Sequence, residues 1–192
     1  MASHLNLLLA NSPLPFLERT VLVTEGLSEP SSARLLRTKA VNFFDLEPEG
    51  RKAKVRIFEG LHQYADTPIS GYYLDASGTV VLPAGEAAHQ FCFLRTFSNS
   101  RLYVTREGDA LLRIYQEQQL GGGSASAVAR TDNMLDEISW HECLQRDIVG
   151  PVRGNALLHK PRSGRWTLII QQIVGVVGSE LVHRVVQRPL QY

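Results

Sequence analysis

The stretch Lys52–Phe58, KAKVRIF, decides the fold class. Its apolar residues at positions 53, 55 and 57 alternate with the cations at positions 52, 54 and 56. This period of two is typical of a β-strand with one buried face and one face in water. Antiparallel sheets commonly have such a solvated face, whereas buried parallel strands read as continuous apolar runs.

Short strand-like segments separated by turn residues continue on both sides of this stretch. Three turns, Asp75–Gly78, Ser98–Ser100 and Glu107–Asp109, predict hairpins that join successive strands. Gly175 lies inside an apolar run and predicts a bulge or a bend. The predicted strands cover residues 20–24, 35–46, 52–58, 69–74, 79–82, 90–97, 101–106, 110–117, 138–144, 155–159, 165–174 and 180–187. Such a long meander avoids open edges best by closing, so we expect an antiparallel up-and-down barrel of about eight to ten strands.

The N-terminal segment, residues 1–15, is the exception to the strand pattern. Ser3 can cap a short helix that ends before Pro13, because proline cannot donate a backbone hydrogen bond. The Gly/Ser-rich stretch at residues 120–132 has a linker composition and is expected to be a flexible surface loop. Neither side of that loop holds a complete core, so residues 1–192 are predicted to form a single domain.

Composition excludes several function classes. The net charge of +1 leaves no basic stripe for a nucleic-acid partner. No apolar run approaches the roughly 20 residues of a membrane span. The two cysteines, Cys92 and Cys143, are expected to be reduced thiols, and a cytoplasmic location follows as the default, with weak organelle targeting left open. Gly121–Gly123 does not join a strand to a helix as a phosphate loop would, so no cofactor is predicted.

The tripeptide His141-Glu142-Cys143 is the most conspicuous candidate for chemistry. On a strand, His141 and Cys143 would share a face. A zinc site would need further ligands, such as His159 and His183, at a tighter spacing than the sequence offers, so no metal is predicted. Cys143 could instead act as a nucleophile activated by His141, although an inert packed cysteine is the simpler interpretation.

Aromatic and basic residues on the predicted strands suggest a lined cavity. Arg95 shares a strand face with three phenylalanines, and an inward arginine would need an anionic partner such as a ligand carboxylate. A solvent-exposed Arg95, or one paired with Asp or Glu, is the alternative. The predicted ligand-binding residues are Arg95, Arg113, Tyr103, Tyr115, Trp140, His141 and Arg184.

The second half of the chain resembles an uncharacterised family of small lipocalin-like β-barrel proteins. The resemblance rests on strand-like segments at 90–97, 101–106 and 112–115, on the His-x-Cys element at 141–143, and on Gly164-Arg165-Trp166 and Val182-His183-Arg184. The Gly-x-Trp element expected near the N-terminus of lipocalin-like barrels is missing. The resemblance implies a lipocalin-like barrel with a cavity, but no activity.

Three functions are therefore carried forward. The first is binding of a small lipophilic or anionic ligand inside the barrel. The second is a protein–protein interaction or assembly module with a filled barrel, in which the N-terminal segment at residues 5–17 docks on a partner or on a second copy to give a homodimer. The third is an enzyme that uses His141, Glu142 and Cys143, and it has the least support from the sequence.

Overall fold

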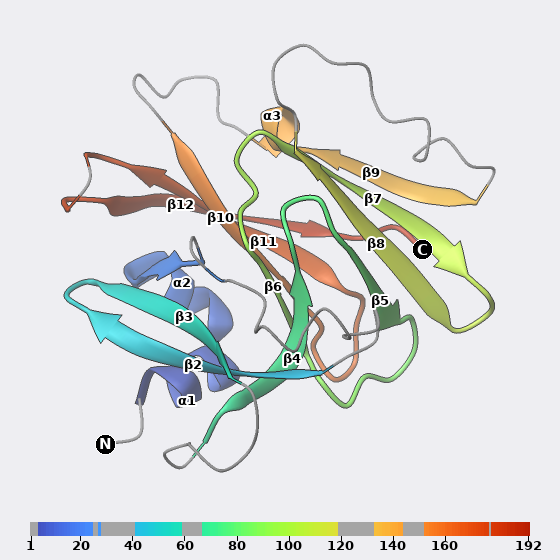
Figure 1. Ribbon diagram of the computed structural model, residues 1–192, viewed down its shortest axis with the longest axis horizontal. Coiled ribbons are helices and arrows are strands. Elements are labelled where there is room, and N and C mark those ends of the chain that lie inside the picture. The colour runs from blue at the N-terminus through green and yellow to red at the C-terminus, as the bar shows by residue number, and fades with distance from the viewer. Residues whose placement is uncertain are drawn as a thin grey trace.

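The computed structural model describes residues 4–24, 27, 41–58, 67–118, 133–143, 152–176 and 178–192. It is mainly β, with two short helices at the N-terminus and two sheets (Figure 1). The predicted loop at 120–132 lies outside the described residues. Among the described residues, no helix is long and apolar enough to cross a membrane.

The larger sheet has eight strands in the order β1-β3-β2-β4-β6-β10-β11-β12, and the smaller has four in the order β5-β8-β7-β9. The larger sheet contains β1 (Val21–Val23), β2 (Asn42–Glu49), β3 (Lys52–Phe58), β4 (Ile69–Leu74), β6 (Phe91–Leu94), β10 (Arg153–His159), β11 (Thr167–Val174) and β12 (Leu181–Pro189). The smaller contains β5 (Thr79–Pro83), β7 (Ser100–Glu107), β8 (Leu111–Gln118) and β9 (Met134–Ser139).

Local sequence patterns predict several elements correctly. The alternating stretch is β3, in which Ala53 and Val55 are buried while Lys54 and Arg56 are exposed. The turn at Gly108, whose φ is +67°, joins β7 and β8 into the predicted hairpin. Gly175 has φ of +110° and ends β11, which confirms the predicted bend.

The expected uninterrupted antiparallel barrel is wrong in two respects. First, the predicted hairpin turns at 75–78 and 98–100 belong to crossovers between sheets, since β4 and β6 lie in the larger sheet while β5 and β7 lie in the smaller. Second, β1 pairs parallel with β3, and β4 pairs parallel with β6. Among the described strands, no ladder joins the two sheets, and they are not closed into a barrel.

Side chains fill the space on both faces of the central strands β6, β10 and β11. The first core lies between the two sheets and includes Trp140 and Trp166. The second lies on the opposite face of the larger sheet and includes Phe44 and Phe93, whose ring centroids are 4.4 Å apart. All four residues of β6 are buried, which explains why FCFL is a continuous apolar run rather than an alternating one.

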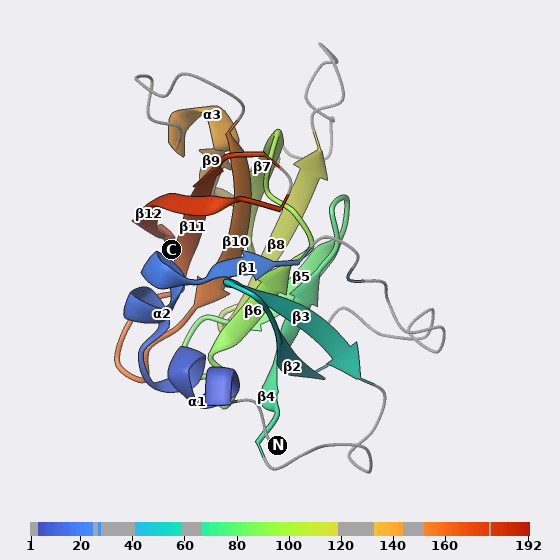
Figure 2. The same ribbon diagram turned by 90° about the vertical axis from the view of Figure 1, so that its left-hand side faces the viewer.

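Two helices cover the second core. Helix α1 (His4–Asn11) confirms the predicted N-terminal helix. Helix α2 (Pro13–Arg19) is not expected from the sequence, because prolines usually end helices. Its two prolines lie in the first turn, where no backbone donor is needed. Figure 2 shows both helices together at the lower left, below β12 and β11.

Candidate functional site

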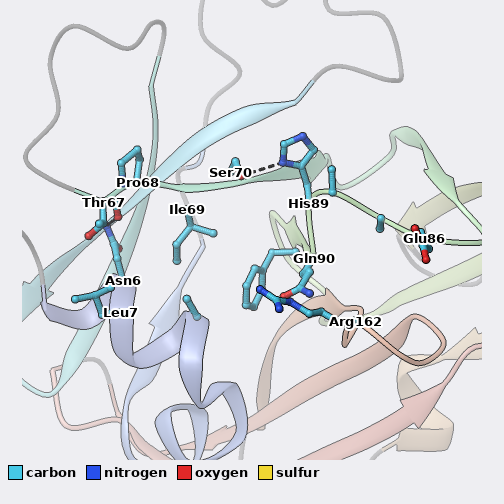
Figure 3. Close-up of a pocket in the computed structure, with 14 residues that line it drawn as sticks. Asn6, Leu7, Thr67, Pro68, Ile69, Ser70, Glu86, His89, Gln90 and Arg162 are labelled. Carbon is cyan, nitrogen blue, oxygen red and sulfur yellow. Dashed lines mark hydrogen bonds between the residues drawn. The ribbon is translucent and has the colours of Figure 1, made fainter.

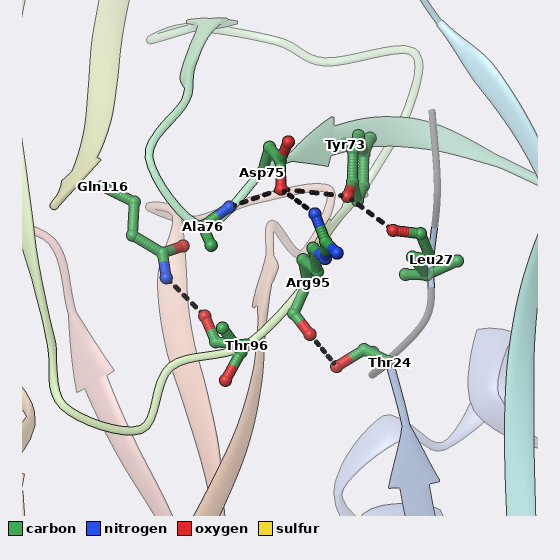
Figure 4. Close-up of polar contacts among 8 residues, drawn as sticks. All are labelled: Thr24, Leu27, Tyr73, Asp75, Ala76, Arg95, Thr96 and Gln116. Carbon is green, nitrogen blue, oxygen red and sulfur yellow. Dashed lines mark hydrogen bonds and ion pairs between the residues drawn. The ribbon is translucent and has the colours of Figure 1, made fainter. Parts of the chain in front are cut away.

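The predicted site residues do not gather around one cavity, and Arg95 shows why. Strand β6 ends at Leu94, so Arg95 follows the strand and is 44% exposed. Its Nη1 lies 3.1 Å from Oδ1 of Asp75, and its carbonyl accepts a hydrogen bond from Thr24 (Figure 4). Arg95 therefore has the carboxylate partner that the alternative interpretation expected, and it joins the end of β1 to the β4–β5 crossover.

The smaller sheet uses the next three predicted residues for its own packing. Tyr103 is buried and stacks on Tyr115, with ring centroids 6.1 Å apart. The Tyr103 hydroxyl donates to Glu117, and burial followed by the Glu117 charge raises the pKa of Tyr103. Arg113 is exposed and pairs with Glu107 at 3.2 Å.

The strand predicted at 138–144 ends early, so His141 and Cys143 of the His-x-Cys element do not share a strand face. Strand β9 stops at Ser139, and Trp140–Cys143 form the short helix α3. His141 is exposed there, while Cys143 is half-buried. Burial raises the pKa of the Cys143 thiol, so a nucleophilic thiolate at neutral pH is disfavoured.

The remaining predicted residues serve packing or face water. Trp140 is buried and meets Phe97 edge to face at 5.9 Å. Arg184 is exposed on β12, opposite Gln172 of β11. Both cysteines are free thiols, as the sequence predicts. Within the described part of the chain, no three His, Cys, Asp or Glu side chains cluster as metal ligands would.

A different set of residues forms a hollow on the described part of the chain. We call it the α1–β4 cleft: it has a volume of about 600 Å³ and opens between helix α1, the start of β4 and the loop that leads into β6 (Figure 3). Parallel strands β4 and β6 both begin here, with Gly71 opposite Phe91. The lining comprises Asn6, Leu7, Ala10, residues 67–70, residues 86–91 and Arg162.

Packing on α1 fixes one wall of the cleft. Asn6 is 2% exposed, and its amide donates to Oδ1 of Asp45 and to the Thr67 carbonyl while its oxygen accepts from Leu46 N–H. All three partners lie on or beside β2 and β4, so the helix cannot shift without breaking buried hydrogen bonds. The wall is therefore preformed.

A histidine–serine pair forms the opposite wall. The Nδ1 atom of His89 lies 2.9 Å from Oγ of Ser70, and the His89 ring meets the Tyr72 ring edge to face at 6.0 Å. These contacts hold the imidazole in place while leaving it half-exposed. The pair supplies hydrogen-bonding groups beside the buried side chains of Ile69 and Phe91, which also line the cleft.

Arg162 adds a positive charge at the rim. It is exposed on the turn between β10 and β11, and among the described residues no carboxylate lies within 4.0 Å of it. Local sequence patterns do not indicate a functional role for Arg162, Ser70 or His89. These residues come together because β4 pairs with β6 and the turn between β10 and β11 lies beside them. This long-range arrangement cannot be inferred from the spacing of residues along the chain.

Comparison with known proteins gives no further assignment. A scan against protein-family models and a search of curated proteins both returned no match.

Proposed function

We propose that this protein binds a small, partly apolar molecule in the α1–β4 cleft. The observation that carries the proposal is a preformed hollow of about 600 Å³ that presents apolar and polar groups together. Ligand sites of small molecules typically have about 300–1,000 Å³ and combine an apolar lining with a few placed polar groups.

The lining divides by chemistry in a way that suits an amphiphilic molecule. Leu7 offers apolar surface, since it is 44% exposed even though it is large, whereas Ile69 and Phe91 line the cleft but are buried. His89 and Ser70 offer a donor and an acceptor on the facing wall. A ligand would bury the apolar surface and hydrogen-bond to the imidazole, which supports binding rather than a purely structural hollow.

This cleft lies outside the space between the two sheets. A lipocalin-like barrel would hold its ligand there, but side chains of the first core occupy that space in the described residues. The proposal therefore keeps ligand binding, which was predicted from the sequence, and moves it to the end of β4 and β6.

A fragment screen by ligand-observed NMR tests the proposal. The variant Ala10→Trp places an indole in the cleft from an exposed position of α1, and it should weaken binding of cleft fragments at least about tenfold. Leu8→Trp is the matched control, since Leu8 is exposed on the same helix but does not line the cleft. Hits that bind both variants equally, or the absence of any hit, would overturn it.

A second candidate function is a protein–protein interaction module, whose space between the sheets is filled by side chains of the first core. The observation that favours it is the exposed apolar surface of the β11–β12 hairpin, where Val176 is 73% and Leu181 is 51% exposed. Edge strands with such surface can pair with another chain. Light scattering of the wild type and of Leu181→Lys should then show an assembly that the lysine disrupts; a monomer at all concentrations argues against self-assembly.

A further inference from the structure

We propose that the ligand of the α1–β4 cleft is an organic anion, with its acidic head held at Arg162 and its apolar body against the exposed lining residues Leu7 and Ala10 of helix α1. This inference rests on the proposed function and deepens it by naming the chemical class of the ligand. It depends on the charges around the rim rather than on the volume of the cleft.

The first step concerns the turn that carries Arg162. Residues 160–165, Lys-Pro-Arg-Ser-Gly-Arg, contain three cations and no acidic residue. Every carboxylate–cation pair found among the described residues lies elsewhere, so neither Lys160 nor Arg162 has an ionic partner there. A free guanidinium at the mouth of a hollow is suited to bind a carboxylate, sulfonate or phosphate through paired N–H donors.

The second step concerns Lys160, which is only 4% exposed. Its ammonium donates to three neutral oxygens, those of Ala84 O at 3.3 Å, Gly164 O at 2.5 Å and the Tyr192 hydroxyl at 3.4 Å. These bonds satisfy its donors but do not neutralise its charge. Lys160 also donates its backbone N–H to Gln90 O, which lies in the cleft lining, so an uncompensated positive charge sits behind this wall.

The third step concerns Glu86, the carboxylate in the cleft lining. Glu86 is exposed and forms no ion pair with Arg162. Figure 3 shows it well apart from Arg162. The two charges therefore do not cancel at the arginine, and the rim at Arg162 remains positive.

Two fluorescent probes of nearly the same shape test the inference. The anion 1-anilinonaphthalene-8-sulfonate and the neutral N-phenyl-1-naphthylamine differ by the sulfonate group. Arg162→Gln should weaken binding of the anion about tenfold and change binding of the neutral probe less than about twofold. Arg165→Gln is the matched control, because it removes the same charge from the same turn at a residue that does not line the cleft.

The outcomes separate this inference from the proposed function. If Ala10→Trp leaves the binding of both probes intact, or if neither probe binds, the cleft itself is not the site. If Ala10→Trp blocks both probes but Arg162→Gln affects neither, the cleft stands and the anionic class is overturned. If Arg162→Gln and Arg165→Gln weaken the anion equally, the general field acts rather than Arg162, which also overturns the head-group assignment.

The acidic head could belong to a free small molecule or to an anionic lipid. Cosedimentation with phosphatidylglycerol vesicles, with phosphatidylcholine vesicles as the control, distinguishes the two sources. Arg162-dependent cosedimentation assigns the head to a lipid, whereas probe binding without cosedimentation assigns it to a free anion; either result, with the Arg162 effect above, supports the inference.

Discussion

Single buried amides join parts of this chain that lie far apart in sequence. The Gln171 side chain on β11 donates to the carbonyls of Leu17 and Thr20 at 2.6 and 2.7 Å, and its oxygen accepts from Leu22 N–H at 2.8 Å. Asn155 on β10 donates to the Leu22 carbonyl as well. Two side chains of β10 and β11 thus satisfy backbone groups of Leu17, Thr20 and Leu22, at the end of α2 and on the edge strand β1.

Gln171→Leu should lower the free energy of unfolding by about 2–4 kcal/mol, because it leaves three backbone groups without partners, two of them in buried hydrogen bonds. Gln187→Leu is the control, since Gln187 is exposed on the neighbouring strand β12 and its replacement should cost less than about 0.5 kcal/mol. Urea denaturation followed by circular dichroism measures both. Equal midpoints for the two variants would refute the role assigned to Gln171.

Glu180 should make stability depend on pH in acid. Its carboxylate lies 2.7 Å from Lys52 Nζ and 3.4 Å from an Arg153 nitrogen, and the hydrogen bond from Lys52, with help from backbone N–H groups, lowers its pKa to about 2. A carboxylate with a lowered pKa stabilises the fold fully above its unfolded value of about 4.5, and this contribution is lost as the pH falls towards 2.

The wild type should therefore be more stable than Glu180→Gln above about pH 5, and the difference should vanish near pH 2. Thermal denaturation at closely spaced pH values between 2 and 7 measures this difference. Glu47→Gln is the control, because the Glu47–Arg56 pair is exposed on both sides and contributes little at any pH. A pH-independent difference for Glu180→Gln would contradict the ionic role.

At the scale of elements, the short helix α3 is seated on β10 by a close contact. A Cβ atom at Gly154 would lie 2.1 Å from two ring atoms of Trp140, so the strand must carry glycine where the indole crosses it. Gly154→Ala should cost about 1–3 kcal/mol of stability through overpacking. Gly85→Ala, where nothing lies within 4 Å, should be nearly neutral.

Trp140→Phe tests whether this contact is the cause, because it removes the two ring atoms that Gly154 approaches most closely. In the Trp140→Phe background, Gly154→Ala should lower the free energy of unfolding clearly less than it does in the wild type. Urea denaturation of the wild type, the two single variants and the double variant measures this difference. An unchanged cost would mean that the alanine acts through the backbone of β10 instead.

The elements also show how far the sequence could predict this structure. Strand β3 and the β7–β8 hairpin follow from local alternation and turn chemistry, which need no knowledge of distant residues. The turn at 75–78 looked like a hairpin for the same reason, yet its two strands enter different sheets. Pairing partners depend on long-range packing, so the parallel β4–β6 pair, and with it the α1–β4 cleft, could not be inferred from local patterns.

At the scale of the whole molecule, two cores share one set of central strands. Neighbours on β10 face opposite ways: Leu157 belongs to the second core and Leu158 to the first. Neither core can be removed without exposing one face of β6, β10 and β11. The sharing argues that the described part of the chain unfolds as one cooperative unit, which also keeps the cleft at the end of β4 and β6 preformed.

Leu157→Ala and Leu158→Ala test this coupling, and each should lower the free energy of unfolding by about 2–5 kcal/mol. Both tryptophans lie in the first core, so their fluorescence reports on that core directly, whereas circular dichroism reports on all strands. Leu157→Ala opens a cavity in the second core, away from the tryptophans. If the two cores unfold together, it should still shift the fluorescence and circular dichroism midpoints by the same amount. If instead the second core unfolds first, circular dichroism of Leu157→Ala shows an early phase to which the tryptophans do not respond. Ile69 and Phe91 belong to that core and form the floor of the cleft, so the cleft would be lost in the same phase.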